Sequence, residues 1–196
     1  TRQVQRGIIK QADMDAGLKR IKGAVKYADL APCDLVIESV VEQDEAKRKV
    51  FADLRSSLKP EALLASNTSS ISITRLAATT DRSDKFIGLH YMNPAPVMEV
   101  VEVIRGLGTS QETYDTSVAF IESLGKTIAN AEDFPAFIVN RVLVPMINEA
   151  VYTLYEGVGS VEAIDKAMKL GAHHPMGPLE LADFIGLDTC LSIMQV

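Results

Sequence analysis

Short apolar runs separated by amphipathic stretches organise the first two thirds of the chain. The runs rich in β-branched residues are predicted to be strands, because such residues pack well on a pleated surface. These predicted strands span residues 34–41, 62–65, 85–89, 97–104 and 126–129. The first is nearly continuous in apolar residues, as expected when both faces of a strand are covered. Strands that alternate with helices predict βαβ units and a parallel sheet.

Amphipathic helices are predicted between these strands. Residues 42–58 carry apolar side chains at helical spacing and are followed by a proline, which favours a helix end. A short helix is predicted over 71–78. Thr109 and Glu112 have the spacing of a capping box, so they predict the start of a further helix, which Gly125 would end.

The chain is predicted to be helical from Phe137 to its end. A long helix over 137–156 contains Pro145, which predicts a kink or an irregular turn. Ser160 caps the next helix, and a last helix follows the loop 171–178.

These patterns together predict an α/β fold. A partial Rossmann-type, doubly wound sheet is followed by an all-α C-terminal domain. The predicted boundaries are 1–132 for the sheet domain and 133–196 for the helical domain. The helical domain is rich in apolar residues, so it is expected to bury part of its surface against a dimer partner or against further sequence.

Residues 1–30 are predicted to be helical and solvated, with Met14, Leu18 and Ile21 forming one apolar stripe. The basic residues of this segment are Lys10, Lys19, Arg20, Lys22 and Lys26. They form a solvated face, or a few of them contact the phosphates of a nucleotide-tailed substrate.

Composition narrows the class of protein. A hydrophobic content of 47% with 23% charged residues is ordinary for a soluble globular protein. A net charge of −6 argues against a general nucleic-acid or anionic-membrane binder, which needs a basic surface. No apolar run approaches the ~20 residues of a membrane span. Cys33 and Cys190 lack metal-site or disulfide spacing, so buried thiols, a reducing cytoplasmic location and no metal site are expected.

His90 lies at the end of a predicted strand. A lone histidine is more often a hydrogen-bonded core group than a catalyst. A carboxylate that bonds one imidazole nitrogen would fix the tautomer and raise the basicity of the other, and Glu102 lies on the next predicted strand. The two residues are therefore a candidate general acid–base pair, although Glu102 also fits an exposed edge-strand carboxylate.

Two further polar residues are candidates for the same crevice. Ser69 lies in a hydroxyl-rich turn, where it either caps the following helix or points its hydroxyl into the crevice. Asn140 lies on the apolar stripe of the long helix, so its amide must bond neighbouring backbone or reach the crevice. Gly106 and Gly108 follow a strand, but Gln111 replaces the third glycine of a dinucleotide-binding loop, so no phosphate site is predicted there.

With these residues assembled, the chain resembles the 3-hydroxyacyl-CoA dehydrogenase family, in the 3-hydroxybutyryl-CoA dehydrogenase group. The resemblance covers essentially everything from Asp34 onward. The matching segments are Asp34-Leu-Val-Ile-Glu-Ser-Val-Val-Glu42, Ser66-Asn-Thr-Ser-Ser70, Gly88-Leu-His-Tyr-Met-Asn-Pro-Ala-Pro-Val-Met-Glu99, Phe137-Ile-Val-Asn-Arg141, Asp165-Lys-Ala-Met-Lys-Leu-Gly171 and Pro175-Met-Gly-Pro178. Several long motifs in one order are more specific than any single pattern.

The resemblance implies reversible, NAD-dependent oxidation of a short-chain (S)-3-hydroxyacyl-CoA to the 3-oxoacyl-CoA. It assigns His90 as the base, Glu102 as the residue that orients it, and Ser69 and Asn140 as contacts of the reacting oxygens. Around the nicotinamide and its ribose it implies Glu42, Lys47, Ser69 and Asn93. It also implies a homodimer that forms through the helical domain.

The chain departs from the family in three respects. The N-terminal glycine-rich loop and the last C-terminal helices are missing, so an internal fragment with weakened NAD binding is expected. The family usually has Pro-Gly-Phe where this chain has Pro135-Ala136-Phe137, a change expected to stiffen a hinge. Two alternatives to the dehydrogenase are a non-catalytic relative of the same fold and a dehydrogenase of a free hydroxy acid.

Overall fold

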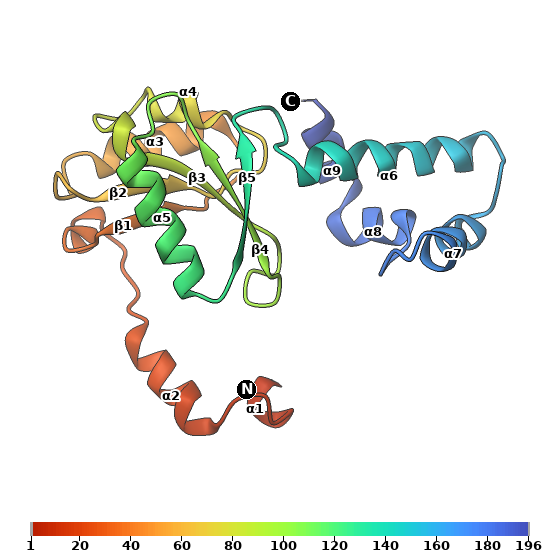
Figure 1. Cartoon of the computed structure of the whole chain (residues 1–196), viewed down its shortest axis with the longest axis horizontal. Helices are drawn as coiled ribbons and strands as arrows, with labels where there is room; N and C mark the ends of the chain where they lie inside the picture. Colours follow the sequence, from red (N-terminus) through yellow and green to blue (C-terminus); the bar gives the residue numbers. More distant parts are fainter. Residues whose placement is uncertain (1, 196) are drawn as a thin grey trace.

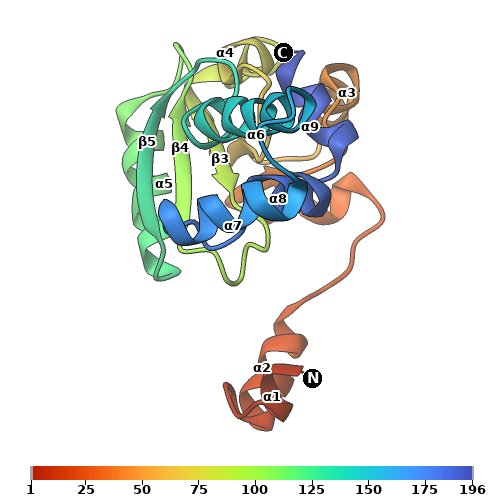
Figure 2. The same cartoon turned by 90° about the vertical axis from the view of Figure 1, so that its right-hand side faces the viewer.

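The computed structural model describes residues 2–195. A twisted five-stranded sheet covered by helices occupies one side of the molecule, and a group of helices lies beside it (Figure 1). An N-terminal helical arm extends away from both (Figure 2). The predicted sequence of a sheet followed by helices is confirmed.

The sheet contains β1 (Leu35–Glu38), β2 (Leu63–Ser66), β3 (Phe86–Tyr91), β4 (Val100–Arg105) and β5 (Thr127–Glu132). The helices that cover it are α3 (Asp44–Leu54), α4 (Ile73–Ala77) and α5 (Gln111–Ser123). The adjoining helices are α6 (Val139–Tyr155), α7 (Val161–Gly171), α8 (Pro178–Ile185) and α9 (Leu187–Met194). The arm contains α1 (Arg2–Gln5) and α2 (Gln11–Arg20), and two short 3₁₀ turns are η1 (Tyr27–Leu30) and η2 (Ser83–Lys85).

The strands follow one another in the order β1-β2-β3-β4-β5. All neighbouring strands run parallel except β3 and β4, which are antiparallel. The segment 92–99 between these two contains no helix. A connection of this length can join antiparallel strands but cannot cross over to a parallel one. The prediction of a parallel sheet therefore holds for three of the four strand pairs.

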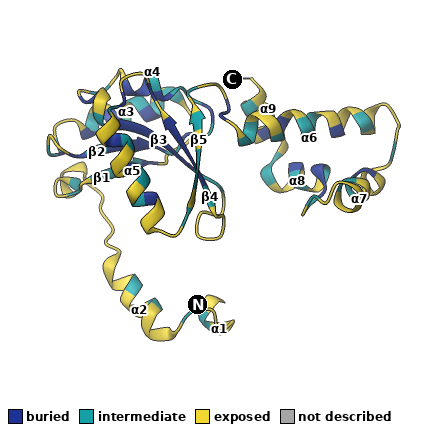
Figure 3. Cartoon of the chain, in the orientation of Figure 1, coloured by how far each residue is buried: buried dark blue, intermediate teal, exposed yellow. Residues whose placement is uncertain are grey.

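Each face of the sheet has its own hydrophobic core, because successive side chains of a strand point to opposite faces. On β3, Phe86 belongs to the core beneath α3 and α4, together with Phe51 and Leu76. Ile87 belongs to the core beneath α5, together with Ile121. Figure 3 shows the buried residues concentrated in this part of the molecule. Every one of these five side chains is 1% exposed or less.

Three predicted local features differ from the structure. Strand β3 continues to Tyr91, so His90 lies inside the strand and not just beyond it. The capping box is wrong by one residue, because Ser110 accepts the Thr113 N–H at the start of α5. The Thr109 hydroxyl instead donates to the carbonyl of Phe86 at 2.6 Å. The single last helix is divided into α8 and α9 at Gly186, whose φ of 100° a side chain would disfavour.

The adjoining helices share a small core of their own. Ile147, Ala182 and Cys190 are buried there against partly buried neighbours. Asp165 fixes the start of α8 by accepting the N–H groups of Leu179 at 2.8 Å and of Glu180 at 2.9 Å. Most of the remaining apolar side chains of α6 to α9 are exposed, so this part contributes far less burial than the sheet.

The arm makes few contacts with the rest of the chain. The predicted helix is confirmed for α2, whose Met14 is half-buried. Leu18 is 58% exposed, and Ile21 lies beyond the helix end with 73% exposure. The predicted stripe is therefore largely uncovered.

Asp133 anchors the segment that leaves the sheet, a role that the sequence pattern did not indicate. Its carboxylate accepts the backbone N–H groups of Ile73 and Thr74, each at 2.8 Å, and the Ser72 hydroxyl at 2.9 Å. These donors form the start of α4, where N–H groups lack partners within the helix. The linker to α6 is thereby tied to the sheet.

The close approach of α4 to β3 gives a test of this packing. A Cβ at Gly88 would lie 2.8 Å from Ile73 Cδ1 and 2.9 Å from Ile104 Cβ. We expect Gly88→Ala to lower the free energy of unfolding by about 1–3 kcal/mol, because a filled core resists extra volume. Urea unfolding measures the change. Gly171→Ala is the matched control, since nothing lies within 4 Å of its Cβ position, and an equal loss in both variants would contradict the packing.

Candidate active site

The antiparallel pairing of β3 and β4 brings the two candidate catalytic residues together. His90 and Glu102 are direct cross-strand partners. The imidazole Nδ1 lies 2.7 Å from Glu102 Oε2. An ionised carboxylate can only accept, so Nδ1 must carry the proton and Nε2 is left as an acceptor. The histidine is 5% exposed and the glutamate is fully buried, so Glu102 is not the exposed edge carboxylate of the alternative interpretation.

The second carboxylate oxygen of Glu102 is bound by the start of α6. Oε1 accepts the backbone N–H groups of Ile138 and Val139, each at 2.9 Å. Burial alone would raise the pKa of Glu102, but hydrogen bonds from His90, Val139 and Ile138 outweigh it. The pKa of this carboxyl is consequently lower than its usual value of 4.5.

Ser69 lies on the open side of the imidazole. Its Oγ is 3.1 Å from His90 Nε2, which makes Ser69, His90 and Glu102 one hydrogen-bonded chain. Of the two interpretations of Ser69, the hydroxyl directed at the crevice fits this contact. The cap of the following helix is supplied by Ser72, which accepts the Arg75 N–H, and by Asp133.

Glu42 holds the turn that carries Ser69. Its Oε1 accepts the backbone N–H of Ser69 at 2.8 Å, both the N–H and the hydroxyl of Ser70 at 3.1 Å, and the Thr68 hydroxyl. Burial opposes ionisation of Glu42, but the Thr68 hydrogen bond, the Lys47 charge and the Ser69 N–H outweigh it. The pKa of Glu42 is therefore lowered.

Lys47 joins Glu42 to a second carboxylate that the sequence analysis did not single out. The ammonium lies 3.2 Å from Glu42 Oε2 and 2.9 Å from Glu38 Oε1. Glu38 also accepts the Ser66 hydroxyl at 2.6 Å. Lys47 is 1% exposed, so its charge acts within the protein and supports Glu42. A lone Glu in an otherwise apolar strand is the sequence signal that could have identified Glu38.

Asn140 and Asn93 approach the same edge of the sheet from different segments. Asn140 is half-buried in the first turn of α6, and its Nδ2 lies 3.5 Å from the carbonyl oxygen of Ser69. This contact fits a reach towards the crevice. Asn93 is exposed, two residues beyond the end of β3.

Asn67 is a further polar residue at this edge that the sequence analysis missed. Its Oδ1 accepts the Tyr91 N–H at 2.8 Å, and its Nδ2 donates to the Ser39 hydroxyl at 3.0 Å. The side chain thus joins the ends of β1 and β3 across the end of β2. Polar groups gathered beyond the carboxyl ends of parallel strands are the ligand crevice of a Rossmann-type fold.

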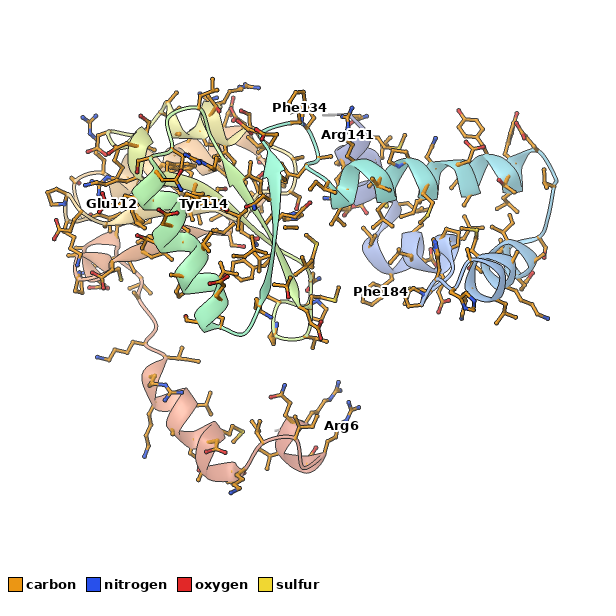
Figure 4. All side chains as sticks on the ribbon, viewed as in Figure 1. Arg6, Glu112, Tyr114, Phe134, Arg141 and Phe184 are labelled. Atoms are coloured by element: carbon orange, nitrogen blue, oxygen red, sulfur yellow. The ribbon has the colours of Figure 1, made fainter. Side chains whose placement is uncertain are left out.

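A groove also lies between β4, β5, α4 and α5. It measures about 860 Å³ and is bordered by Arg105, Tyr114, Asn130 and Phe134 among others. Figure 4 shows Phe134 on the linker beyond β5. None of Ser69, His90 and Glu102 lines this groove.

Cys33 is half-buried and Cys190 is buried, both as free thiols, and burial raises the pKa of Cys190. Across residues 2–195, no group of three potential metal ligands occurs. No helix within that range is long and apolar enough to cross a membrane.

The fold and the polar groups at this edge place the protein in the class of Rossmann-type, dinucleotide-binding proteins. The sequence profile of the 3-hydroxyacyl-CoA dehydrogenase NAD-binding domain matches residues 1–134, and that of the C-terminal domain matches residues 137–196. The chain belongs to the 3-hydroxyacyl-CoA dehydrogenase family and is an NAD-dependent dehydrogenase.

Three relatives illustrate the similarity. The chain is 66% identical to a 3-hydroxybutyryl-CoA dehydrogenase of Bradyrhizobium diazoefficiens, covering all of this chain and 67% of the relative. It is 51% identical to a probable 3-hydroxybutyryl-CoA dehydrogenase of Bacillus subtilis, covering all of this chain and 68% of the relative. The crystal structure of (S)-3-hydroxybutyryl-CoA dehydrogenase from Ralstonia eutropha superposes with a TM-score of 0.95 at 48% identity, over 99% of this chain and 69% of that one.

The residues present fit the nicotinamide end of NAD. The Glu42 carboxylate remains 37% exposed despite its ion pair, while Ser69 is half-buried and Asn93 exposed. Carboxylate, hydroxyl and amide groups are suited to the hydroxyls and amide of a nicotinamide riboside. Their place beyond the ends of β1, β2 and β3 is where this fold binds its ligand.

The lowered pKa of Glu102 gives a stability test. The ionised carboxylate contributes stability that is fully present above about pH 4.5 and is lost as the pH falls through the lower folded-state pKa. We expect Glu102→Gln to reduce the free energy of unfolding at pH 7 by about 1.5–3 kcal/mol, since charge-assisted hydrogen bonds are lost. The difference from the wild type should narrow as the pH falls below 4.5.

Urea unfolding between pH 7 and pH 3 measures this difference. Glu99→Gln is the control, because Glu99 is exposed and lies just before β4. A gap between Glu102→Gln and wild type that stays constant over the whole range would contradict the assignment.

Proposed function

We propose that this protein oxidises (S)-3-hydroxyacyl-CoA thioesters reversibly to 3-oxoacyl-CoA, with His90 as the general base. The observation that carries the proposal is the chain Ser69–His90–Glu102, with contacts of 3.1 Å and 2.7 Å. Two relatives support the proposal by their names: one is a 3-hydroxybutyryl-CoA dehydrogenase and the other a probable 3-hydroxybutyryl-CoA dehydrogenase.

The proton transfer follows from the tautomer. Glu102 holds the proton on Nδ1, so the lone pair of Nε2 faces the crevice and accepts the proton of the substrate 3-hydroxyl. The imidazolium that forms is stabilised by the buried carboxylate 2.7 Å away. In the reverse reaction the same imidazolium returns the proton to the 3-oxo oxygen.

Ser69 and Asn140 position the reacting oxygen. The Ser69 hydroxyl already lies against Nε2, so it can hydrogen-bond a substrate oxygen bound there. The Asn140 amide lies at the same turn and supplies a donor from α6. Because these residues come from the two parts of the molecule, we propose that 1–132 and 133–196 act as separate domains with the site between them.

Glu42, Lys47 and Asn93 serve the cofactor. Glu42 and Asn93 would contact the nicotinamide and its ribose, and the buried Lys47 would hold Glu42 ionised in place. Held there, NAD would supply the acceptor for the hydride from C3 of the substrate. We also propose that the substrate has a short acyl chain and that the protein is located in the cytoplasm.

A catalytic test uses the full-length protein with NADH and acetoacetyl-CoA. We expect His90→Gln to lower kcat by about 10²–10⁴-fold, because general acid–base catalysis contributes a factor of this size. His174→Gln is the matched control, since that histidine lies in the loop before α8. Turnover in His90→Gln equal to the control would refute the role of His90.

A second assay separates the substrate classes. Acetoacetyl-CoA and longer 3-oxoacyl-CoA thioesters are compared with free acetoacetate under the same conditions. We expect a higher kcat/KM with the thioesters than with the free acid, because CoA supplies binding energy remote from the reacting carbon. Among the thioesters, the proposed short-chain preference requires the highest value with the four-carbon one. A preference for the free acid would favour the hydroxy-acid alternative, and no turnover with any of them would favour a non-catalytic relative.

We further propose that two copies pair through the helical part. The exposed apolar side chains of α6 include Val142 at 68% and Tyr152 at 52% exposure, a density that is unusual for a free surface. Phe184 of α8 is also exposed, at 70%, at the edge of the helical part opposite Arg141 (Figure 4). A homodimer that covers this face would remove the apolar area from water.

The dimer is tested by sedimentation of the full-length protein. We expect Tyr152→Glu to weaken the dimer at least tenfold, because an unpaired charge would be buried at the interface. Glu122→Lys, on the exposed side of α5, should leave the dimer unchanged. A monomeric wild type, or a dimer insensitive to Tyr152→Glu, would contradict the proposal.

A further inference from the structure

Two consecutive residues of the linker before α6 adopt a left-handed backbone. Ala136 has a φ of 64° and Phe137 a φ of 50°. Neither is glycine, and a left-handed conformation costs an ordinary residue about 1–2 kcal/mol. Such strain persists only where the surrounding structure holds it. The family resemblance leads us to expect glycine at position 136, and glycine would adopt this backbone freely. With alanine at this position, the left-handed corner costs more conformational free energy than it would with glycine.

The core of the sheet holds the corner in place. Phe137 is 3% exposed and belongs to the hydrophobic core shared by α3 and α4. The turn is closed by hydrogen bonds from the Phe137 N–H to the Phe134 carbonyl at 3.0 Å and from the Arg141 N–H to the Ala136 carbonyl at 3.2 Å. The aromatic ring is thus an anchor of the linker within the sheet.

The same ring lies against the candidate base. The centroids of the Phe137 ring and the His90 imidazole are 5.7 Å apart, with the planes tilted by 57°. This separation lies within the range of ring contacts that fix relative orientation. Glu102 bonds one edge of the imidazole and Ser69 the opposite nitrogen, so Phe137 adds a contact that neither hydrogen bond supplies.

The corner also aims the first N–H groups of α6. The next two residues, Ile138 and Val139, donate to Glu102 Oε1, each at 2.9 Å. These donors lie at the helix start, where no carbonyl within the helix can accept them. The direction of their N–H bonds depends on the two left-handed residues immediately before them.

We infer that Phe137 is a positioning residue, which packs against His90 and, through the corner it anchors, holds the start of α6 on Glu102. The geometry of the His90–Glu102 pair is then set by the linker as well as by strand pairing. The kinetic part of this inference rests on the proposed role of His90 as base. The structural part does not depend on it.

An ordinary core role for Phe137 would give a different result. Replacing a core residue lowers stability wherever it lies, typically by several kcal/mol for a large side chain. It would not alter the His90–Glu102 hydrogen bond or the turnover of the molecules that stay folded. Leu76→Ala is a suitable control, because Leu76 is fully buried in the same core and lies on α4, which carries no site residue.

The first measurement is the proton NMR signal of the His90 Nδ1–H in the full-length protein. A short hydrogen bond to a carboxylate shifts such a signal downfield. We expect Phe137→Ala to move or broaden it, Phe137→Leu to preserve most of the wild-type shift, and Leu76→Ala to leave it unchanged. An unchanged signal in Phe137→Ala would overturn the inference, whatever the protein catalyses.

The second measurement is steady-state kinetics at a temperature where urea titration shows every variant folded. We expect Phe137→Ala to lower kcat by about 10–100-fold with the KM for NAD within about twofold, because small misplacements of a catalytic group are costly. Phe137→Leu should recover much of the loss, and Leu76→Ala should keep the wild-type kcat. If Phe137→Ala had the same kcat as Leu76→Ala while His90→Gln were inactive, the positioning role of Phe137 would be refuted and the proposed function would stand. If His90→Gln kept full turnover, the proposed function would fail instead.

Discussion

The carboxylate of Glu102 is the group on which both parts of the molecule depend. One oxygen bonds His90 and the other accepts two N–H groups at the start of α6. A fully buried charge is stable only when it is well paired, and here the partners are a catalytic candidate and a helix terminus. The residue that we propose to orient the base is therefore also the residue that joins the sheet to α6 through hydrogen bonds.

A second ion cluster, centred on the buried Lys47, supports the other side of the crevice. Glu38 and Glu42 bracket the ammonium of Lys47, and Glu42 in turn accepts the N–H groups that shape the turn of Ser69. A buried pair of this kind is weak evidence for stability in itself. Its role here is geometric. Removing the lysine would leave the carboxylates of Glu38 and Glu42 without a positive partner beneath the serine that faces His90. The site is thus a rigid set of hydrogen bonds on strand ends.

Packing strength is unequal across the chain. The sheet has two well-filled cores, whereas the helices beyond it have one small buried cluster, formed by Ile147, Ala182 and Cys190, and expose many of their apolar side chains. The strained corner at Ala136 and Phe137 is held by the stronger of these two bodies. The packing of the sheet core therefore sets the orientation of α6. The small core among α6 to α9 contributes less to this orientation.

Local sequence pattern determined the strands and most helices of this protein, because apolar periodicity reflects which face of each element is buried. Family motifs pointed to His90, Glu102, Ser69 and Asn140, and the tertiary structure decided how they meet. Because β4 runs antiparallel to β3, Glu102 lies opposite His90 and is buried. The spacing of the two residues in the sequence does not determine this pairing. The cap that Asp133 gives α4 and the Ser66–Glu38 hydrogen bond join residues 60 and 28 positions apart, and the left-handed Ala136 is a matter of backbone angles. In a sequence, the residues that make such long-range contacts are only isolated polar residues. Their partners, and hence their structural roles, are known once the fold is known.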